Sequence, residues 1–213
     1  MDEYIKPDYK NIALITIDVQ NDSALPGSPL EIKGTMDIIP NTVKLLALFR
    51  EHLKLVIHII RLYKEDGSNV DLVRRKRIES GISAVRPGSD GAELVNELKP
   101  KSFKINSERL LKGFSQELTS NEFIIYKPRW GAFYSTPLEE ILRAKKITTL
   151  AFTGCNFPNC PRTSIYEASE RDFRIVIIQD AISGIYDRGL EELRNIGCEV
   201  ILTDDFIRSL NIN

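Results

Sequence analysis

The sequence has little of what metal sites, disulfide frameworks and nucleic-acid surfaces need. Its 213 residues include two histidines and three cysteines, and the formal net charge is −1. A charge so close to zero gives no electrostatic footprint for a nucleic acid or an anionic membrane. Three cysteines cannot pair completely, which favours a reducing compartment. We therefore expect neither a nucleic-acid nor a membrane partner, and a cytoplasmic location.

Long hydrophobic runs are also missing. No apolar stretch approaches the roughly 20 residues that a membrane span needs. The first residues, Met1 to Tyr4, lack the basic start and apolar core of a signal peptide. Hydrophobic residues nevertheless make up 42% of the chain, enough to fill a core. We expect one domain over residues 1–213.

Short β-branched runs alternate along the chain with segments of helical spacing. The runs cover 12–17, 55–60, 123–126, 147–152, 175–178 and 200–202, and helical spacing appears at 45–49, 137–142, 162–172 and 190–196. Strands lose the period-two pattern when both of their faces are buried, as in parallel sheets. The pattern therefore predicts a three-layer α/β/α fold, with a doubly wound, mostly parallel, Rossmann-like sheet.

The segment 64–121 does not follow this alternation. It contains the basic run Arg74 to Arg77 and several glycines, and we expect one or two helices with long loops. The segment is either a cover over an active site or a solvated surface insertion. The basic run is either a carboxylate-binding patch or, as we favour from the sequence, a solvated helix face.

Polar side chains follow three of the predicted strands. Asp18 follows the first strand, Lys127 the third, and the fourth leads through Gly154 to Cys160. Ligands of such sheets bind beyond the carboxyl ends of the strands. An acid, an amine and a thiol are therefore expected to meet at one edge of the sheet.

Cys160 is the strongest candidate for a nucleophile. Pro161 follows it, and proline is favoured at the first helical position, so we expect Cys160 at a helix N-cap. The helix dipole and the Lys127 ammonium would lower the pKa of the thiol, and free N–H groups could receive an oxyanion. For Cys155 and Cys198 we favour the ordinary role of a small buried side chain.

Three segments carry a resemblance to a known family. Ala13 to Asp22, Lys127 to Leu138 and Gly154 to Cys160 resemble the opening strand, the lysine segment and the nucleophile segment of the isochorismatase-like cysteine hydrolases. That superfamily includes nicotinamidases, N-carbamoylsarcosine amidases and ureidoacrylate amidohydrolases. The similarity runs from about Asn11 to Leu202, with the middle of the chain unassigned.

The resemblance implies a catalytic triad of Asp18, Lys127 and Cys160. It also implies a cis peptide bond between Cys155 and Asn156, and an oxyanion hole formed by the backbone N–H groups of Asn156 and Cys160. Asp18 would take the thiol proton while Lys127 holds the ion pair. The thiolate would then attack an amide-like carbonyl, and water would hydrolyse the acyl-enzyme.

The expected activity is cleavage of a C–N bond in a small amide, ureido or carbamoyl substrate. We expect Gln20, Arg129, Trp130 and Phe133, which lie in the first two of these segments, to contact the substrate. We also expect a homo-oligomer, either a dimer or a tetramer, and no cofactor.

Departures from the family pattern leave alternatives open. Nicotinamide-hydrolysing relatives usually bind a metal through Asp and histidines, whereas His52 and His58 alone cannot supply that set, so we expect no catalytic metal. Ser23 stands where an aromatic is common. Isochorismatase-type vinyl-ether cleavage and a non-catalytic binding domain remain alternatives. A phosphoacceptor module is disfavoured, because Arg61 rather than an acceptor Asp follows the second strand.

Overall fold

The computed structural model describes residues 2–100 and 103–212, so residues 1, 101–102 and 213 of the expected domain lie outside the described residues. Within them, seven strands form one sheet in the order β3-β4-β2-β1-β5-β6-β7. The strands are β1 Ile12–Ile17, β2 Leu55–Ile60, β3 Gln116–Thr119, β4 Glu122–Tyr126, β5 Thr149–Gly154, β6 Arg174–Ile182 and β7 Glu199–Ile201. Only the β3–β4 pair is antiparallel. The predicted mostly parallel α/β sheet is confirmed.

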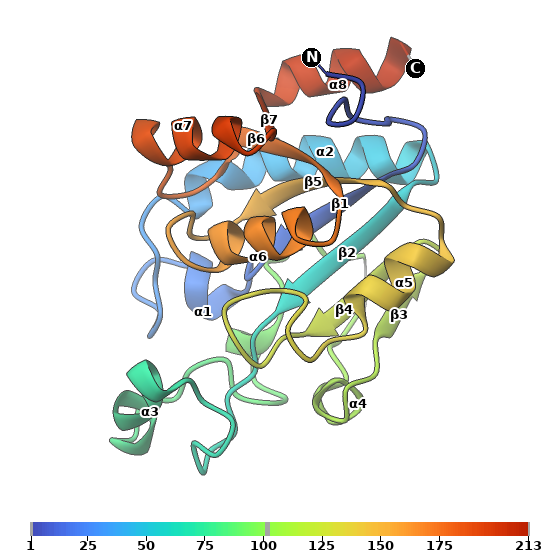
Figure 1. The fold of residues 1–213 in the computed structure, drawn as a ribbon. Helices are drawn as coiled ribbons and strands as arrows, with labels where there is room; N and C mark the ends of the chain where they lie inside the picture. The colour runs from blue at the N-terminus through green and yellow to red at the C-terminus, as the bar shows by residue number, and fades with distance from the viewer. Residues whose placement is uncertain (1, 101–102, 213) are drawn as a thin grey trace.

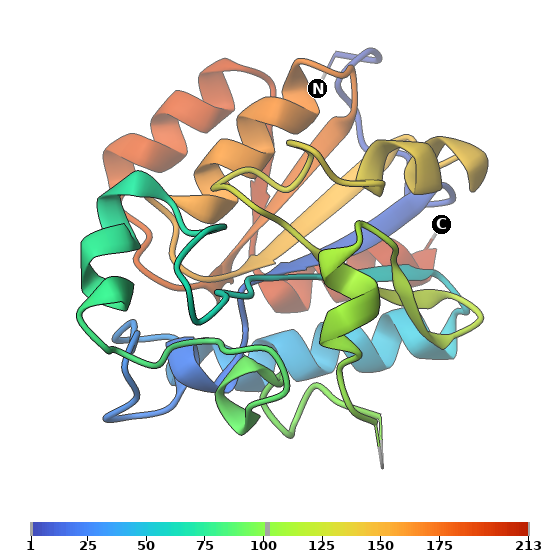
Figure 2. The ribbon, with the colours of Figure 1, turned by 90° about the horizontal axis from the view of Figure 1, so that it is seen from below.

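Helices cover both faces of the sheet (Figures 1 and 2). One face packs against α2 Ile39–Glu51 and α8 Thr203–Ile212, and the other against α5 Leu138–Ala144, α6 Cys160–Ser169 and α7 Asp187–Asn195. The shorter elements are α1 Asn21–Ala24, η1 Met36–Ile38, α3 Leu72–Glu79, η2 Asp90–Ala92 and α4 Ser107–Leu111. None of the helices described is long and apolar enough to cross a bilayer.

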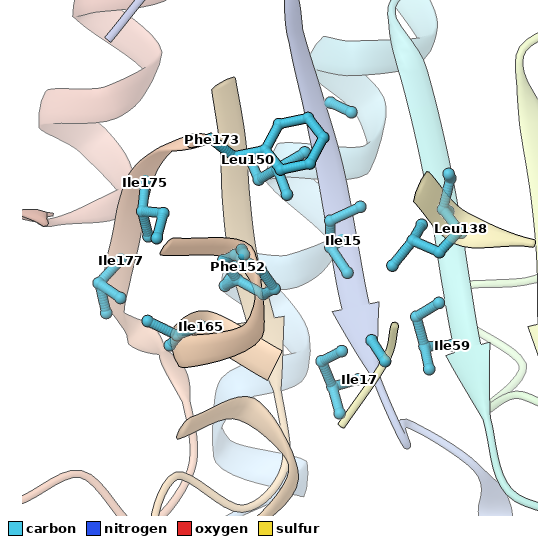
Figure 3. Packing of buried hydrophobic residues seen from close by; sticks show 14 of the residues in the cluster. Ile15, Ile17, Ile59, Leu138, Leu150, Phe152, Ile165, Phe173, Ile175 and Ile177 are labelled. Atoms are coloured by element: carbon cyan, nitrogen blue, oxygen red, sulfur yellow. The ribbon is translucent and has the colours of Figure 1, made fainter. Parts of the chain in front are cut away.

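The two cores take alternate residues of the same strands. In β1, Ile15 and Ile17 face α5 and α6, whereas Ile12 and Leu14 face α2; Figure 3 shows the first of these cores. Each fully buried aliphatic side chain contributes about 1.5–3 kcal/mol. Burial on both faces explains why the sequence shows continuous apolar runs here.

The chain reverses its direction of winding between β1 and β5. Strand β2 lies on one side of β1 and β5 on the other, which makes the carboxyl ends of β1 and β5 a topological switch point. Gly154, at the end of β5, has a φ of 117°, and a Cβ there would lie 2.2 Å from the carbonyl oxygen of Ile17. Only glycine permits this approach of the two strands beside the site.

The segment 64–121 differs in part from the prediction. The helices α3 and α4 were expected, but the edge strand β3 was not. β3 has four residues and alternates half-buried with exposed positions, so it lacks an apolar run. The helix α8 was also missed, because its apolar residues follow the last predicted strand without a separate signal.

Candidate functional site

Backbone hydrogen bonds carry the parallel ladder one residue beyond the strands and so position the site. The N–H groups of Asp18 and Lys127 donate to the last two carbonyl oxygens of β2, at 2.9 and 3.0 Å, and the N–H of Cys155 donates to Ile17 at 2.9 Å. Asp18 has a φ of 53°, a left-handed conformation that Asp tolerates better than most residues. These hydrogen bonds therefore fix the positions of Asp18, Lys127 and Cys155 relative to one another at the carboxyl edge of the sheet.

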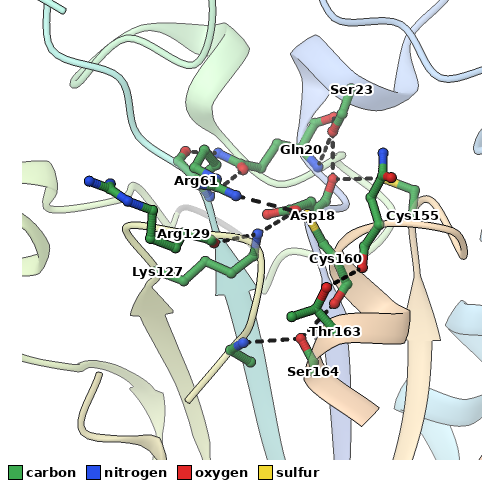
Figure 4. A network of polar contacts seen from close by, with 12 residues as sticks. Asp18, Gln20, Ser23, Arg61, Lys127, Arg129, Cys155, Cys160, Thr163 and Ser164 are labelled. Atoms are coloured by element: carbon green, nitrogen blue, oxygen red, sulfur yellow. Dashed lines mark hydrogen bonds and ion pairs between the residues drawn. The ribbon is translucent and has the colours of Figure 1, made fainter. Parts of the chain in front are cut away.

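A buried ion pair joins two of the predicted site residues. Lys127 Nζ lies 2.8 Å from Asp18 Oδ2, and the Lys127 side chain has no exposed surface (Figure 4). Burial alone raises the pKa of the Asp18 carboxyl, but Lys127 and then Arg61 outweigh it and hold that pKa below its usual range. Asp18 is therefore ionised at neutral pH. Its other oxygen, Oδ1, has no hydrogen-bond partner in the described part of the chain.

Cys160 is the first residue of α6, and Asn159 is the N-cap, one residue earlier than predicted. The Cys160 side chain is buried and lines the same cavity as Asp18. Burial and the charge of Asp18 raise the pKa of the Cys160 thiol, against the opposing effects of Lys127 and Arg61. The prediction of a lowered thiol pKa is therefore wrong, because it considered the helix dipole and the lysine but neither burial nor the neighbouring carboxylate.

The expected oxyanion-hole residues lie on the loop between β5 and α6. The Cys155–Asn156 peptide bond is cis, as the resemblance implied. Within the described residues, neither the N–H of Asn156 nor that of Cys160 donates a hydrogen bond. Two free backbone donors beside a thiol are the feature that stabilises a tetrahedral oxyanion.

Arg61 is a site residue that the sequence analysis missed. It follows β2 directly, and its Nη1 donates to Asp71 Oδ2 at 3.0 Å while its Nη2 lies 3.9 Å from Cys160 Sγ. Figure 4 shows the guanidinium beside Asp18 and Lys127. The signal was available, since Arg61 occupies the same strand-end position as Asp18 and Lys127.

These side chains open onto a cavity of about 330 Å³, within the usual range of small-molecule sites. Asp18, Arg61 and Cys160 lie in its lining, with Arg74 and Arg77 of α3. The loop 28–32 after α1 forms a further part of the wall. Two residues of the basic run therefore line the cavity, whereas Lys76 of the same helix is exposed.

Of the four residues expected to contact substrate, one lines the cavity. Gln20 does so, but its amide group is bound to the backbone of Arg61 and Ala92 at 2.7–2.9 Å. The other three lie outside the lining. Phe133 is buried in the core, Trp130 packs partly against it and Arg129 is exposed.

The histidines lie away from the cavity. His58 is buried within β2, between Thr16 and Glu122 at 2.8 Å each, and His52 contacts Asn211 at 3.2 Å. Among the described residues, no three His, Cys, Asp or Glu side chains are arranged to hold a metal ion. The absence of a catalytic metal stays a prediction.

The other two cysteines are free and buried. Cys155 Sγ contacts the carbonyl oxygen of Asp18 at 3.1 Å, and burial raises the pKa of its thiol well above the usual value. Cys198 lies outside the cavity, and burial raises the pKa of its thiol to about 12. Both match the structural role expected of them.

Known proteins resemble this chain over most of its length. The isochorismatase domain model matches residues 12–205. An Arabidopsis thaliana protein named a probable inactive nicotinamidase is 32% identical, over 89% of this chain and 91% of its own. The ureidoacrylate amidohydrolase RutB of Methylorubrum extorquens is 29% identical, over 91% and 79%. The crystal structure of an isochorismatase family protein from Desulfovibrio vulgaris superposes with a TM-score of 0.81 at 29% identity, covering 94% of this chain and 98% of that one.

Proposed function

The chain belongs to the isochorismatase family, and we propose that it is a cysteine hydrolase that cleaves a C–N bond of a small amide, ureido or carbamoyl compound. The observation that carries the proposal is that Asp18, ion-paired to the fully buried Lys127 at 2.8 Å, lines the same cavity as Cys160. A carboxylate held ionised beside a protonated thiol is a general base next to a nucleophile. The amidohydrolase similar to this chain supports a C–N bond as the target.

In the first half-reaction, Asp18 accepts the thiol proton of Cys160 as the sulfur attacks the substrate carbonyl. Because the thiol pKa is raised and the Asp18 pKa lowered, the proton rests on sulfur until attack. Lys127 and Arg61 stabilise the thiolate as it forms, and the N–H groups of Asn156 and Cys160 bind the oxyanion. Asp18 then gives the proton to the leaving nitrogen as the C–N bond breaks, which leaves a thioester.

In the second half-reaction, water attacks the thioester carbonyl. Asp18, ionised again, takes a proton from that water, and the C–S bond breaks as the sulfur regains a proton. The product carries the new carboxyl group, and the site returns to its starting state. Asp18 thus acts as base and then acid in each half-reaction, returning the proton of the water to the sulfur in the second, while Lys127 favours its ionised form between proton transfers.

Nicotinamide itself is not the substrate that we propose. The residue at the position where an aromatic is common, Ser23, is buried and donates its hydroxyl to the carbonyl oxygen of Asp18 at 2.5 Å, so it offers no stacking surface for a flat ring. The Arabidopsis relative is itself named as a probable inactive nicotinamidase. A different amide fits both observations.

The test compares Cys160→Ala with Cys198→Ala, a matched removal of a buried thiol outside the cavity. Ammonia release from a panel of small amides, ureas and carbamoyl compounds should vanish for Cys160→Ala and persist for Cys198→Ala, with both melting temperatures close to that of the parent protein. Normal turnover by Cys160→Ala, or no ammonia from any compound with the parent protein, contradicts the proposal.

We further propose that the enzyme acts in the cytoplasm as a dimer or tetramer. The three free cysteines of the described chain favour a reducing compartment. Sedimentation of the purified protein measures the oligomeric state.

A further inference from the structure

Asp71 is a buried carboxylate beside the site that the mechanism above does not use. It directly precedes α3, and its side chain is 4% exposed. Its Oδ2 accepts hydrogen bonds from Arg61 Nη1 and from the Tyr63 hydroxyl, at 3.0 Å each. Asp71 does not line the cavity, so its effect on the reaction passes through a neighbouring residue.

Asp71 occupies the N-cap of α3 without capping the helix by its side chain. An aspartate at this position ordinarily accepts a hydrogen bond from a backbone N–H of the first helical turn. Here the backbone carbonyl oxygen of Asp71 accepts from the N–H groups of Arg74 and Arg75, at 2.9 Å each, while its carboxylate makes no cap hydrogen bond. The carboxylate is turned to Arg61 instead, which gives it a role separate from starting the helix.

Arg61 lies within electrostatic range of both the acid and the thiol of the site. Its Nη2 lies 3.9 Å from Cys160 Sγ, and its charge lowers the pKa of the Asp18 carboxyl. Arg61 nevertheless forms its ion pair with Asp71, and Asp18 forms its own with Lys127. No nitrogen of Arg61 comes within 4.0 Å of a carboxylate oxygen of Asp18.

Asp18 therefore keeps an oxygen that a released guanidinium would occupy. Its Oδ1 is buried and has no hydrogen-bond partner among the described residues. Guanidinium and carboxylate groups pair strongly, often through two parallel hydrogen bonds. Without Asp71, Arg61 would pair with this oxygen. A carboxylate held by two cations, Lys127 and Arg61, is a poorer proton acceptor than one held by Lys127 alone.

We propose that Asp71 is a positioning residue, which holds Arg61 beside the Cys160 sulfur and away from Asp18. This rests on the proposed function. Arg61 in this position stabilises the thiolate as it forms, while Asp18 Oδ1 stays free to take and return the proton. Asp71 neither contacts the reacting atoms nor carries the proton. It competes with Asp18 for the guanidinium, and so keeps that cation off the base.

The test measures how strongly Asp18 acts on the thiol, and it needs no turnover. The pH midpoint of iodoacetamide alkylation is read from the Cys160 peptide by mass spectrometry. In the parent protein, Asp18→Asn should lower this midpoint by about one pH unit, because it removes a negative charge beside the sulfur. In the Asp71→Asn protein, the same substitution should lower the midpoint by less than half as much, since Arg61 there already neutralises Asp18.

Three further proteins show whether the change passes through Arg61. Asp66→Asn removes an exposed carboxylate from the same connection, and it should leave the effect of Asp18→Asn at its parent size. Asp71→Ser keeps a residue that caps helices but cannot pair with Arg61, so it should behave as Asp71→Asn does. In a protein that carries Arg61→Met, Asp71→Asn should no longer alter the effect of Asp18→Asn.

These outcomes separate the positioning role from the proposed hydrolysis. The role is overturned if Asp18→Asn shifts the midpoint equally in the parent and Asp71→Asn proteins, or if the reduction persists without Arg61, even where ammonia is released. A reduction that requires Arg61 supports the role even if no compound is hydrolysed. Where the parent protein does hydrolyse a compound of the panel, kcat should also fall severalfold in Asp71→Asn, and an unchanged kcat overturns the role as well.

Discussion

Strands β1, β2 and β4 carry two buried polar clusters, which differ in how many of their polar atoms have hydrogen-bond partners. The inner cluster joins Thr16, His58 and Glu122 with Arg50 of α2. Arg50 donates to both carboxylate oxygens of Glu122, at 2.6 and 2.9 Å, and His58 lies 2.8 Å from one of them. The remaining imidazole nitrogen lies 2.8 Å from the Thr16 hydroxyl. None of these four residues lines the cavity beside Cys160.

The edge cluster, a few residues further along the same strands, is left incomplete. Asp18 Oδ1, Arg61 Nε and Asp71 Oδ1 are all buried without a partner among the described residues, and the first two side chains line the cavity. A completed network stabilises a fold, whereas unpaired charges at a cavity keep a capacity for binding and proton transfer. The difference teaches that these two clusters, similar in burial and charge, are separated by whether their polar atoms have partners.

The largest effect is expected from Asp18→Asn. Removing the base should lower kcat about 10²–10⁴-fold, because the thiol proton has no acceptor. The same change removes the negative charge that raises the thiol pKa, so the midpoint of Cys160 alkylation against pH should move down. Steady-state kinetics and iodoacetamide labelling measure the two effects. An unchanged kcat removes Asp18 from the mechanism.

Glu122→Gln should instead lower the free energy of unfolding and leave kcat unchanged. Losing the charge leaves Arg50 without its ion pair, and breaking a buried pair costs about 3 kcal/mol. Urea unfolding measures this loss, with the exposed Glu117→Gln as the control. The kcat of the folded protein should be unchanged. A loss of kcat with full stability contradicts the division between the two clusters.

The pH dependence of stability sharpens the same test. Burial raises the pKa of Glu122, but hydrogen bonds and charge from His58 and Arg50 outweigh it and lower that pKa to about 2, against 4.5 without these effects. The stability it contributes is therefore fully present above about pH 4.5 and is lost as the pH falls towards 2. Over that interval the gap in unfolding free energy between the parent protein and Glu122→Gln should shrink.

Lys127→Met removes the positive charge of the ion pair in the edge cluster. Lys127 lowers the pKa of the Cys160 thiol, so its removal should raise the alkylation midpoint by about one pH unit, equivalent to about 1.4 kcal/mol. Asp18→Asn should move the same midpoint down. The exposed Lys76→Met is the control. Shifts in the same direction for both site variants would mean that the ion pair does not tune the thiol.

The smallest effect is expected from Arg129→Ala. Its guanidinium donates to the carbonyl oxygens of Pro128 and Asn69, at 2.7 and 3.3 Å, and it lies outside the cavity lining. Stability should change by less than about 0.5 kcal/mol, and KM should stay within the error of the assay. A large rise in KM would instead show that Arg129 contacts the substrate, as the sequence analysis expects.

Six of the seven described strands, and the edge where Asp18, Lys127 and Cys160 meet, could be predicted. Burial on two faces leaves continuous apolar runs, and the strand ends are read directly from these runs. Arg61 could have been predicted in the same way, because it directly follows a predicted strand. The position of α3 beside the cavity could not be predicted, because a basic run has the same sequence pattern whether it faces water or a cavity. The raised thiol pKa was also hidden, since it depends on how deeply the thiol is enclosed.

The ladder hydrogen bonds that hold Asp18, Lys127 and Cys155 also govern how this edge moves. An amide bonded into a sheet exchanges its hydrogen only when the surrounding strands separate, and openings of a central sheet are among the rarest in a protein. The acid and the lysine therefore keep their spacing through the fast local fluctuations of the chain. Helix α3, whose Arg74 and Arg77 line the cavity, is attached through side-chain hydrogen bonds such as Arg77 to Pro29 and lies outside this ladder, so the two walls of the cavity depend on different kinds of contact.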